Sequence, residues 1–154
     1  GYNLFVYDLR LAEIAYAVDQ LWQAPWADRG RMALLGSSEG AVAAALYRGD
    51  EFRGRVIAQW TCSGAPHVEG IAAPAEEPIL ALVGGEDPWY AANPGLDCGQ
   101  FLEGRRLDCG QFLEGRPLST AKVIEGAGLP DHEVLADPAV QELVAEFLLE
   151  VMTP

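Results

Sequence analysis

Residues 31–47 read RMALLGSSEGAVAAALY, and the order of residue types in this stretch decides the fold. The apolar run Arg31–Leu35 predicts a buried strand, and the alanine-rich run Ala41–Leu46 predicts a helix. Between them lies Ser38, with a glycine two positions before it and another two positions after it. A strand, a glycine-flanked serine and a helix in direct succession are the sequence form of a nucleophile elbow.

The tight turn of such an elbow predicts a role for each residue around the serine. We expect glycine at Gly36 and Gly40 because a side chain at either position would collide with the neighbouring strand and helix. Ser38 would then lie exposed at the N-terminus of the helix. The backbone N–H of Glu39 would point at the oxyanion that forms when the hydroxyl attacks a carbonyl. The Glu39 side chain takes no part in this chemistry.

Length, composition and charge narrow the class of protein. The chain has 154 residues, half of them apolar, which is enough for one substantial core and predicts a single domain over residues 1–154. The formal charge of −13, from 23 acidic and 10 basic residues, would repel nucleic acid and anionic membranes. No apolar stretch reaches membrane-spanning length, so we expect neither nucleic acid nor membrane as a partner. Because the sequence begins at Gly1, we expect a processed chain or a piece of a longer one.

The cysteines and glycines bear on redox state and cofactors. Cys62, Cys98 and Cys109 are an odd number in a chain large enough to fold without disulfides. We therefore interpret them as reduced thiols, which favours a cytoplasmic location. No Cys/His cluster has metal-ligand spacing, and Gly84-Gly85 lacks the pattern of a phosphate-binding loop. The sequence thus predicts no metal and no organic cofactor.

Apolar runs interleaved with helical patterns predict the fold class. The run Asn3–Tyr7 predicts a strand, and apolar spacing from Leu11 onward predicts a helix that ends before Pro25. The other predicted elements are strands at Arg55–Thr61, Pro78–Val83 and Ala121–Ile124 and a helix from about Pro138 to Val151, with Asp137 as its N-cap. Strands without apolar–polar alternation, separated by helices, indicate an α/β fold with a mostly parallel sheet and helices on both faces.

Four polar residues, Ser38, His67, Asp87 and His132, follow predicted strands and would lie at the carboxyl edge of that sheet, where sites of parallel sheets form. A serine nucleophile needs a base, and the base needs a third group to orient it. His132 follows the last strand and Asp87 follows the preceding one, so Ser38, His132 and Asp87 are the predicted nucleophile, base and acid. His67 is the alternative base, since it also follows a strand, and Glu86 is the alternative acid.

An exact duplication interrupts this pattern. Residues 96–105 and 107–116 both read LDCGQFLEGR, with one arginine between the copies. Eleven residues make about three helical turns, so the second copy could extend a helix without rotating its apolar stripe. We favour a tolerated insertion or an artefact of the sequence, because loops absorb insertions readily. A functional lid is the alternative.

The motifs together resemble the α/β-hydrolases, closest to the dienelactone-hydrolase-like and esterase branch. Residues 31–47 are similar to the fifth strand, elbow and following helix of that family. Residues 78–88 resemble its acid-bearing strand and loop, residues 121–132 its final strand and histidine loop, and residues 1–10 its fourth strand. The resemblance covers nearly the whole chain apart from the repeat.

The resemblance implies a serine hydrolase that cleaves carboxylic esters or lactones through an acyl-enzyme. Ser38 would be the nucleophile, His132 the base, Asp87 the acid and the Glu39 N–H an oxyanion donor, with a small-molecule ester or lactone as substrate. No cofactor is implied.

The chain also departs from the family. Three strands and a helix precede the position of Gly1 in family members, and the loop after the third strand supplies the second oxyanion donor. Either the strand Asn3–Tyr7 moves beside Arg31–Leu35 or another chain fills the gap, so we expect a homo-oligomer or a missing N-terminal segment. The alternative function is a catalytically silent hydrolase-like fragment, or an interaction module completed by a partner chain.

Overall fold

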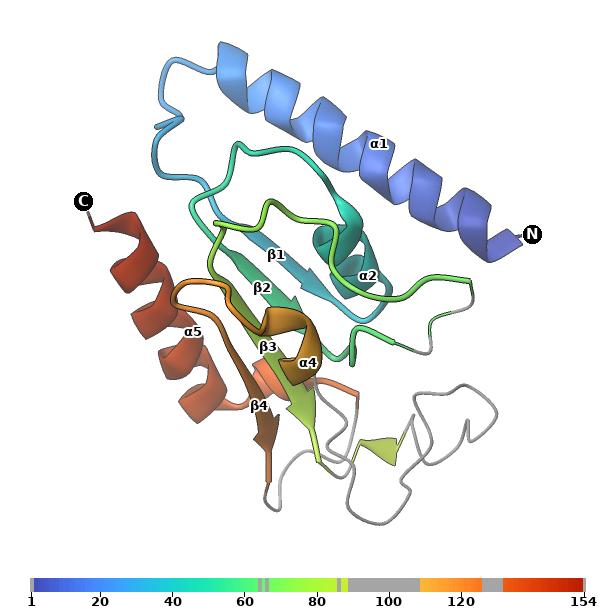
Figure 1. The fold of residues 1–154 in the computed structure, drawn as a ribbon. Coiled ribbons are helices and arrows are strands. Elements are labelled where there is room, and N and C mark those ends of the chain that lie inside the picture. Colours follow the sequence, from blue (N-terminus) through green and yellow to red (C-terminus); the bar gives the residue numbers. More distant parts are fainter. Residues whose placement is uncertain are drawn as a thin grey trace.

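The computed structural model describes residues 2–63, 65, 67–85, 87–88, 109–125 and 132–153. At its centre lies a four-stranded, all-parallel sheet in the order β1-β2-β3-β4 (Figure 1). The strands are β1 (Leu34–Ser37), β2 (Arg55–Ala58), β3 (Ile79–Gly84) and β4 (Thr120–Ile124). The helices are α1 (Tyr2–Gln23), α2 (Glu39–Leu46), α4 (Gly110–Leu113), the short 3-10 helix η2 (Val134–Ala136) and α5 (Pro138–Met152).

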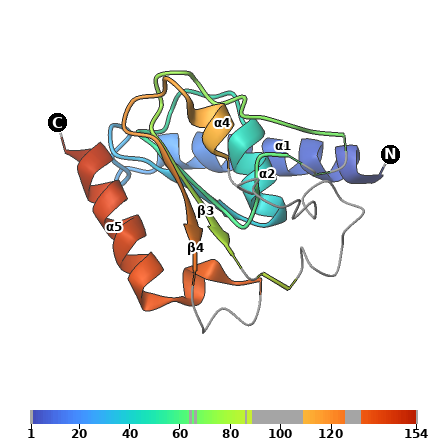
Figure 2. The ribbon, with the colours of Figure 1, turned by 60° about the horizontal axis from the view of Figure 1, so that its bottom comes forward.

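Helices cover both faces of the sheet, as Figure 2 shows. Alternate residues of β2 face opposite sides: Ile57 packs in a cluster with α2, α4 and Tyr7 of α1, whereas Val56 packs against α5. β3 does the same with Ala81 and Leu80. Because both faces are covered, β2 and β3 are buried along their whole length. The predicted α/β fold with a parallel sheet between helices is confirmed.

The predicted strand at Asn3–Tyr7 is wrong, since these residues belong to α1. No glycine or proline interrupts the chain from Tyr2 to Gln23, so one helix can run through the whole segment. Tyr7 and Val18 are its buried positions, and their separation of eleven residues, about three turns, places them on one face. A five-residue apolar run cannot distinguish strand from helix by its period. In the described part of the chain, no helix is both long and apolar enough to cross a membrane.

The remaining elements differ from their predicted bounds by a few residues. β1 begins at Leu34 rather than Arg31, and β2 ends at Ala58 because Gln59 adopts a positive φ of 60° that leaves the strand. The last helix is confirmed with its cap: the Asp137 side chain accepts a hydrogen bond of 2.8 Å from the Ala139 N–H, and Pro138 is the first helical residue.

The prediction of three reduced thiols is wrong, because Cys62 and Cys109 form a disulfide. Both cysteines are buried in the cluster between the sheet and α2. The spacing of the cysteines does not indicate this disulfide, because the two partners are 47 positions apart in the sequence. The cytoplasmic location was inferred from free thiols and loses that basis, because disulfides persist mainly in oxidising compartments.

The second copy of the repeat contributes to the core. Cys109 and Leu113 are buried, and α4 ends at Leu113, shortly before Gly115 with its positive φ of 79°. The first copy, at residues 96–105, lies outside the described residues, and in the described part of the second copy only Gly110–Leu113 is helical. The role of the duplication stays a prediction.

A buried ion pair ties the amino edge of the sheet to α2. Arg55, at the start of β2, is fully buried and donates to both carboxylate oxygens of Glu77 at 2.7 and 2.9 Å. The same guanidinium donates to the carbonyls of Ala44, Tyr47 and Gly49, which lie at or just beyond the end of α2 and lack helical partners. Burial raises the pKa of Glu77 above its ordinary value, and the hydrogen bonds from Arg55 offset only part of this shift.

Removing the Glu77 charge should strongly destabilise the fold. Glu77→Gln leaves the buried Arg55 charge without a counterion, which typically costs about 3–5 kcal/mol. Urea unfolding measures this loss, and Glu76→Gln at the exposed neighbouring position is the matched control. Equal free energies of unfolding for the two variants would contradict the role assigned to the ion pair.

Reducing the disulfide should also destabilise the protein. Closing a loop of this length contributes about 4 kcal/mol in the chain-entropy model. In a Cys98→Ser background, reducing agent should lower the urea midpoint of the parent but not that of a Cys62→Ala/Cys109→Ala double variant. A midpoint insensitive to reduction in the parent would show that the bond adds nothing to stability.

Candidate functional site

Ser38 occupies a strained turn between β1 and α2. Its φ of 54° and ψ of −120° lie outside the regions that side chains favour, which costs on the order of 1–3 kcal/mol. Hydrogen bonds hold the turn from both sides: the Ser38 N–H donates to the Ala58 carbonyl at 2.9 Å, and the Ser38 carbonyl accepts from the Ala41 N–H at 3.0 Å. The sheet and the helix thus impose the conformation that an elbow requires.

The two flanking glycines have different roles. A Cβ at Gly36 would overlap the backbone carbonyl of Gly40 and lie 2.8 Å from the Ala41 nitrogen, so this position requires glycine, as predicted. A Cβ at Gly40 would meet no atom of the described residues within 4 Å. The predicted collision at Gly40 is therefore wrong, because Gly40 faces β1 with its backbone carbonyl while its Cβ position points into open space.

Ser38, His132 and Asp87 form one hydrogen-bonded chain. The distance from His132 Nε2 to Ser38 Oγ is 2.9 Å, and the distance from His132 Nδ1 to Asp87 Oδ2 is 2.5 Å. In the neutral imidazole with its proton on Nδ1, that N–H donates to the carboxylate and Nε2 accepts the serine O–H. The structure brings together the three residues that sequence reasoning selected.

Different elements position these side chains at the carboxyl edge of the sheet. Ser38 follows β1, Asp87 follows β3, and His132 follows β4 and lies two residues before η2. Val134 of η2 is fully buried against β2, β3 and α5, which holds the histidine segment on the core. The Asp87 side chain is 1% exposed and that of His132 is 21% exposed, so the acid is sequestered and the base can be reached.

The residue after the serine supplies a backbone N–H that has no acceptor among the described residues. Glu39 is the first residue of α2, so its N–H has no acceptor within the helix. Its side chain pairs with Arg10 of α1, Oε1 lying 3.0 Å from Arg10 Nε, and Arg10 also pairs with Glu13. Hydrogen bonds with Glu13 and Glu39 raise the Arg10 pKa. The Glu39 side chain thus contacts α1, and among the described residues it makes no hydrogen bond to Ser38 or His132.

The alternative base and acid are not part of this arrangement. His67 is exposed, has a positive φ of 67°, and makes no hydrogen bond to Ser38 or Asp87 within the described structure. Glu86 lies outside the described residues. His132 is therefore the histidine that contacts Ser38.

Sequence reasoning missed a fourth polar residue, Gln59. This residue is 3% exposed, and its side-chain Nε2 donates to Asp87 Oδ2 at 2.8 Å. The run Arg55–Thr61 predicts a continuous strand, and a glutamine within a strand does not by itself indicate a site residue. The available signal was an amide directly after the apolar run Val56–Ala58, at the edge where the site forms.

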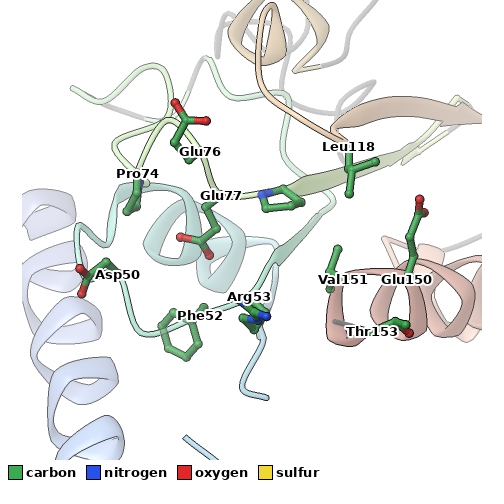
Figure 3. Close-up of a pocket in the computed structure, with 11 residues that line it drawn as sticks. Asp50, Phe52, Arg53, Pro74, Glu76, Glu77, Leu118, Glu150, Val151 and Thr153 are labelled. Atoms are coloured by element: carbon green, nitrogen blue, oxygen red, sulfur yellow. The ribbon is translucent and has the colours of Figure 1, made fainter. Parts of the chain in front are cut away.

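No metal centre accompanies the site in the part of the chain that the structure describes, since no group of three or more His, Cys, Asp or Glu side chains could hold an ion. A pocket of about 390 Å³ lies elsewhere (Figure 3). Its lining residues include Phe52 and Arg53, just before β2, and Glu77 and Pro78, just before β3. It therefore lies at the amino edge of the sheet, opposite Ser38.

Comparison of the chain with models of protein families, with curated proteins and with solved structures gave no match. The hydrogen-bonded chain of Ser38, His132 and Asp87 is therefore interpreted from its own geometry.

The two glycines of the elbow should respond oppositely to alanine. Gly36→Ala forces β1 and α2 apart and should destabilise the fold by about 1–3 kcal/mol or more. Gly40→Ala adds a methyl group in open space and replaces a helical glycine, so stability should rise by up to about 1 kcal/mol. Thermal unfolding of both variants tests this difference. Equal destabilisation by the two substitutions would contradict the assigned close approach.

Proposed function

We propose that the protein is a serine hydrolase that cleaves carboxylic esters or lactones through an acyl-enzyme. The observation that supports this most is the continuous hydrogen-bonded chain from Ser38 Oγ through His132 to Asp87. A hydroxyl, a base within hydrogen-bond reach and a carboxylate behind the base are the arrangement that activates serine.

In the proposed reaction, His132 takes the Ser38 proton as Oγ attacks the substrate carbonyl. Asp87 accepts the hydrogen bond from Nδ1, keeps the imidazole in the tautomer whose Nε2 is free, and stabilises the imidazolium. The imidazolium then protonates the leaving oxygen, and the C–O bond breaks to give the acyl-enzyme. Water, deprotonated by His132, attacks the acyl carbonyl and releases the acid with Ser38 restored.

The negative charge on the carbonyl oxygen needs donors. The Glu39 N–H at the start of α2 is the donor we assign, and the dipole of the helix adds to its effect. The strained φ of Ser38 supports this assignment, because it turns the serine out of the strand immediately before the helix.

Esters and lactones suit the chemistry of these groups. Acyl transfer from an ester or lactone needs a nucleophile, a base and fixed dipoles, and no step requires a metal or organic cofactor. The order Ser38, Asp87, His132 along the chain is also that of the α/β-hydrolases, which supports a place for this chain beside the dienelactone-hydrolase-like enzymes.

Ser38→Ala should abolish labelling of the protein by a fluorophosphonate and hydrolysis of an activated ester. Asp87→Asn should lower kcat by about 10⁴-fold, because the amide favours the wrong histidine tautomer. Steady-state kinetics and mass mapping of the adduct measure both effects. Ser37→Ala is the matched control, since it alters the neighbouring hydroxyl and should leave labelling at Ser38 intact.

Two results would overturn the proposal. One is a wild-type protein that is not labelled at Ser38, and the other is ester turnover that Ser38→Ala leaves unchanged. Either would favour the catalytically silent module instead.

A further inference from the structure

We infer that Gln59 is a positioning residue that fixes the carboxylate of Asp87 for its work on His132. The inference rests on the proposed function of the Ser38 chain. Among the described residues, two donors contact Asp87 Oδ2: His132 Nδ1 at 2.5 Å and Gln59 Nε2 at 2.8 Å. The same oxygen that orients the base is thus itself held by a buried amide.

The orientation of the Gln59 amide follows from its other partner. Gln59 Oε1 lies 3.0 Å from the backbone nitrogen of Gly84, and a backbone N–H can only donate. The oxygen must therefore face Gly84, which leaves the NH₂ group to face Asp87. A flipped amide would place its oxygen against the Asp87 carboxylate and its NH₂ against the Gly84 N–H, and both contacts would be repulsive. Only one orientation therefore satisfies both contacts.

The backbone explains why a side chain performs this role. The Gln59 N–H still pairs with the Leu82 carbonyl at 2.7 Å, as in a parallel ladder. In that ladder the Gln59 carbonyl would accept from the Gly84 N–H. Gln59 instead takes a φ of 60° and ends β2, and its own side-chain oxygen accepts from Gly84. The amide therefore links the end of β2, the end of β3 and the acid.

The choice of residue supports a role beyond turning the chain. At a positive φ, glycine and asparagine are favoured over longer side chains. Glutamine has the greater length needed to reach both Gly84 N and Asp87 Oδ2 from this backbone. Gln59 is 3% exposed and both ends of its amide are paired, so the amide opposes rotation of the Asp87 carboxylate away from His132.

The test compares Gln59→Leu and Gln59→Asn with Ser119→Ala. Ser119 Oγ accepts from the Ile79 N–H at 2.9 Å, at the opposite end of β3, so its loss also frees one backbone N–H of that strand. We expect both Gln59 variants to lower kcat for an activated ester by about 10–100-fold with KM little changed, because the acid is misplaced. Ser119→Ala should leave kcat within about twofold, since it acts on stability alone.

A double-mutant cycle locates the effect. In an Asp87→Asn background, Gln59→Leu should reduce kcat by no more than about twofold, because no carboxylate remains to be positioned. Equal kcat losses for Gln59→Leu and Ser119→Ala, or an undiminished effect of Gln59→Leu in the Asp87→Asn background, would overturn the inference.

A second readout needs no activity and so separates this inference from the proposed function. Proton NMR of the imidazole N–H, assigned with His67→Gln, should show the hydrogen-bonded Nδ1 proton of His132 in the wild type and in Ser119→Ala. Gln59→Leu should lose that signal or expose it to solvent exchange. An unchanged signal in Gln59→Leu would overturn the positioning role even if Ser38 proves to be catalytic, and a lost signal would support it even if Ser38 is not labelled.

Discussion

The close approach of β1 to α2 at Gly36 is the constraint on which the rest of the site depends. Only a glycine there lets the first turn of the helix lie against the end of the strand. The chain then reverses within a few residues, and Ser38 takes a positive φ that it would not adopt alone. Sheet and helix hydrogen bonds on either side of the serine hold that strain. The half-buried Ser38 hydroxyl beside His132 and the N–H of Glu39 at the helix start both depend on this one contact.

The parallel sheet brings residues that are far apart in the chain together at a single edge. β1, β3 and β4 all end on the same side, so the residues that follow them meet there. Ser38 and His132 are 94 positions apart in the sequence, yet their side chains lie within a hydrogen bond of 2.9 Å. The buried carboxylate of Asp87 is tolerated because His132 and Gln59 both donate to it. Arg55 and Glu77 form an ion pair at the opposite edge, where they stabilise α2 without entering the site.

Sequence reasoning identified the elements whose local signals were unambiguous. Asp137 before Pro138 marked the start of α5, and the glycine-flanked Ser38 marked the elbow. It was wrong where two structures share one local signal. The run Asn3–Tyr7 is as apolar as a strand and proved to be part of a helix. It also failed for Cys62 and Cys109, since a disulfide depends on the distance between two cysteines and not on their number.

The sequence by itself determined the fold class, the elbow and the choice of Ser38, Asp87 and His132 as candidate residues. Each of these depends on a local signal: apolar runs, glycine at a crowded turn, or a polar residue after a strand. Only the tertiary structure decided that Gly40 lies in open space, that Cys62 and Cys109 pair, and that Gln59 contacts Asp87. These features depend on the packing of segments distant in sequence. The spacing of residues along the chain does not indicate that packing.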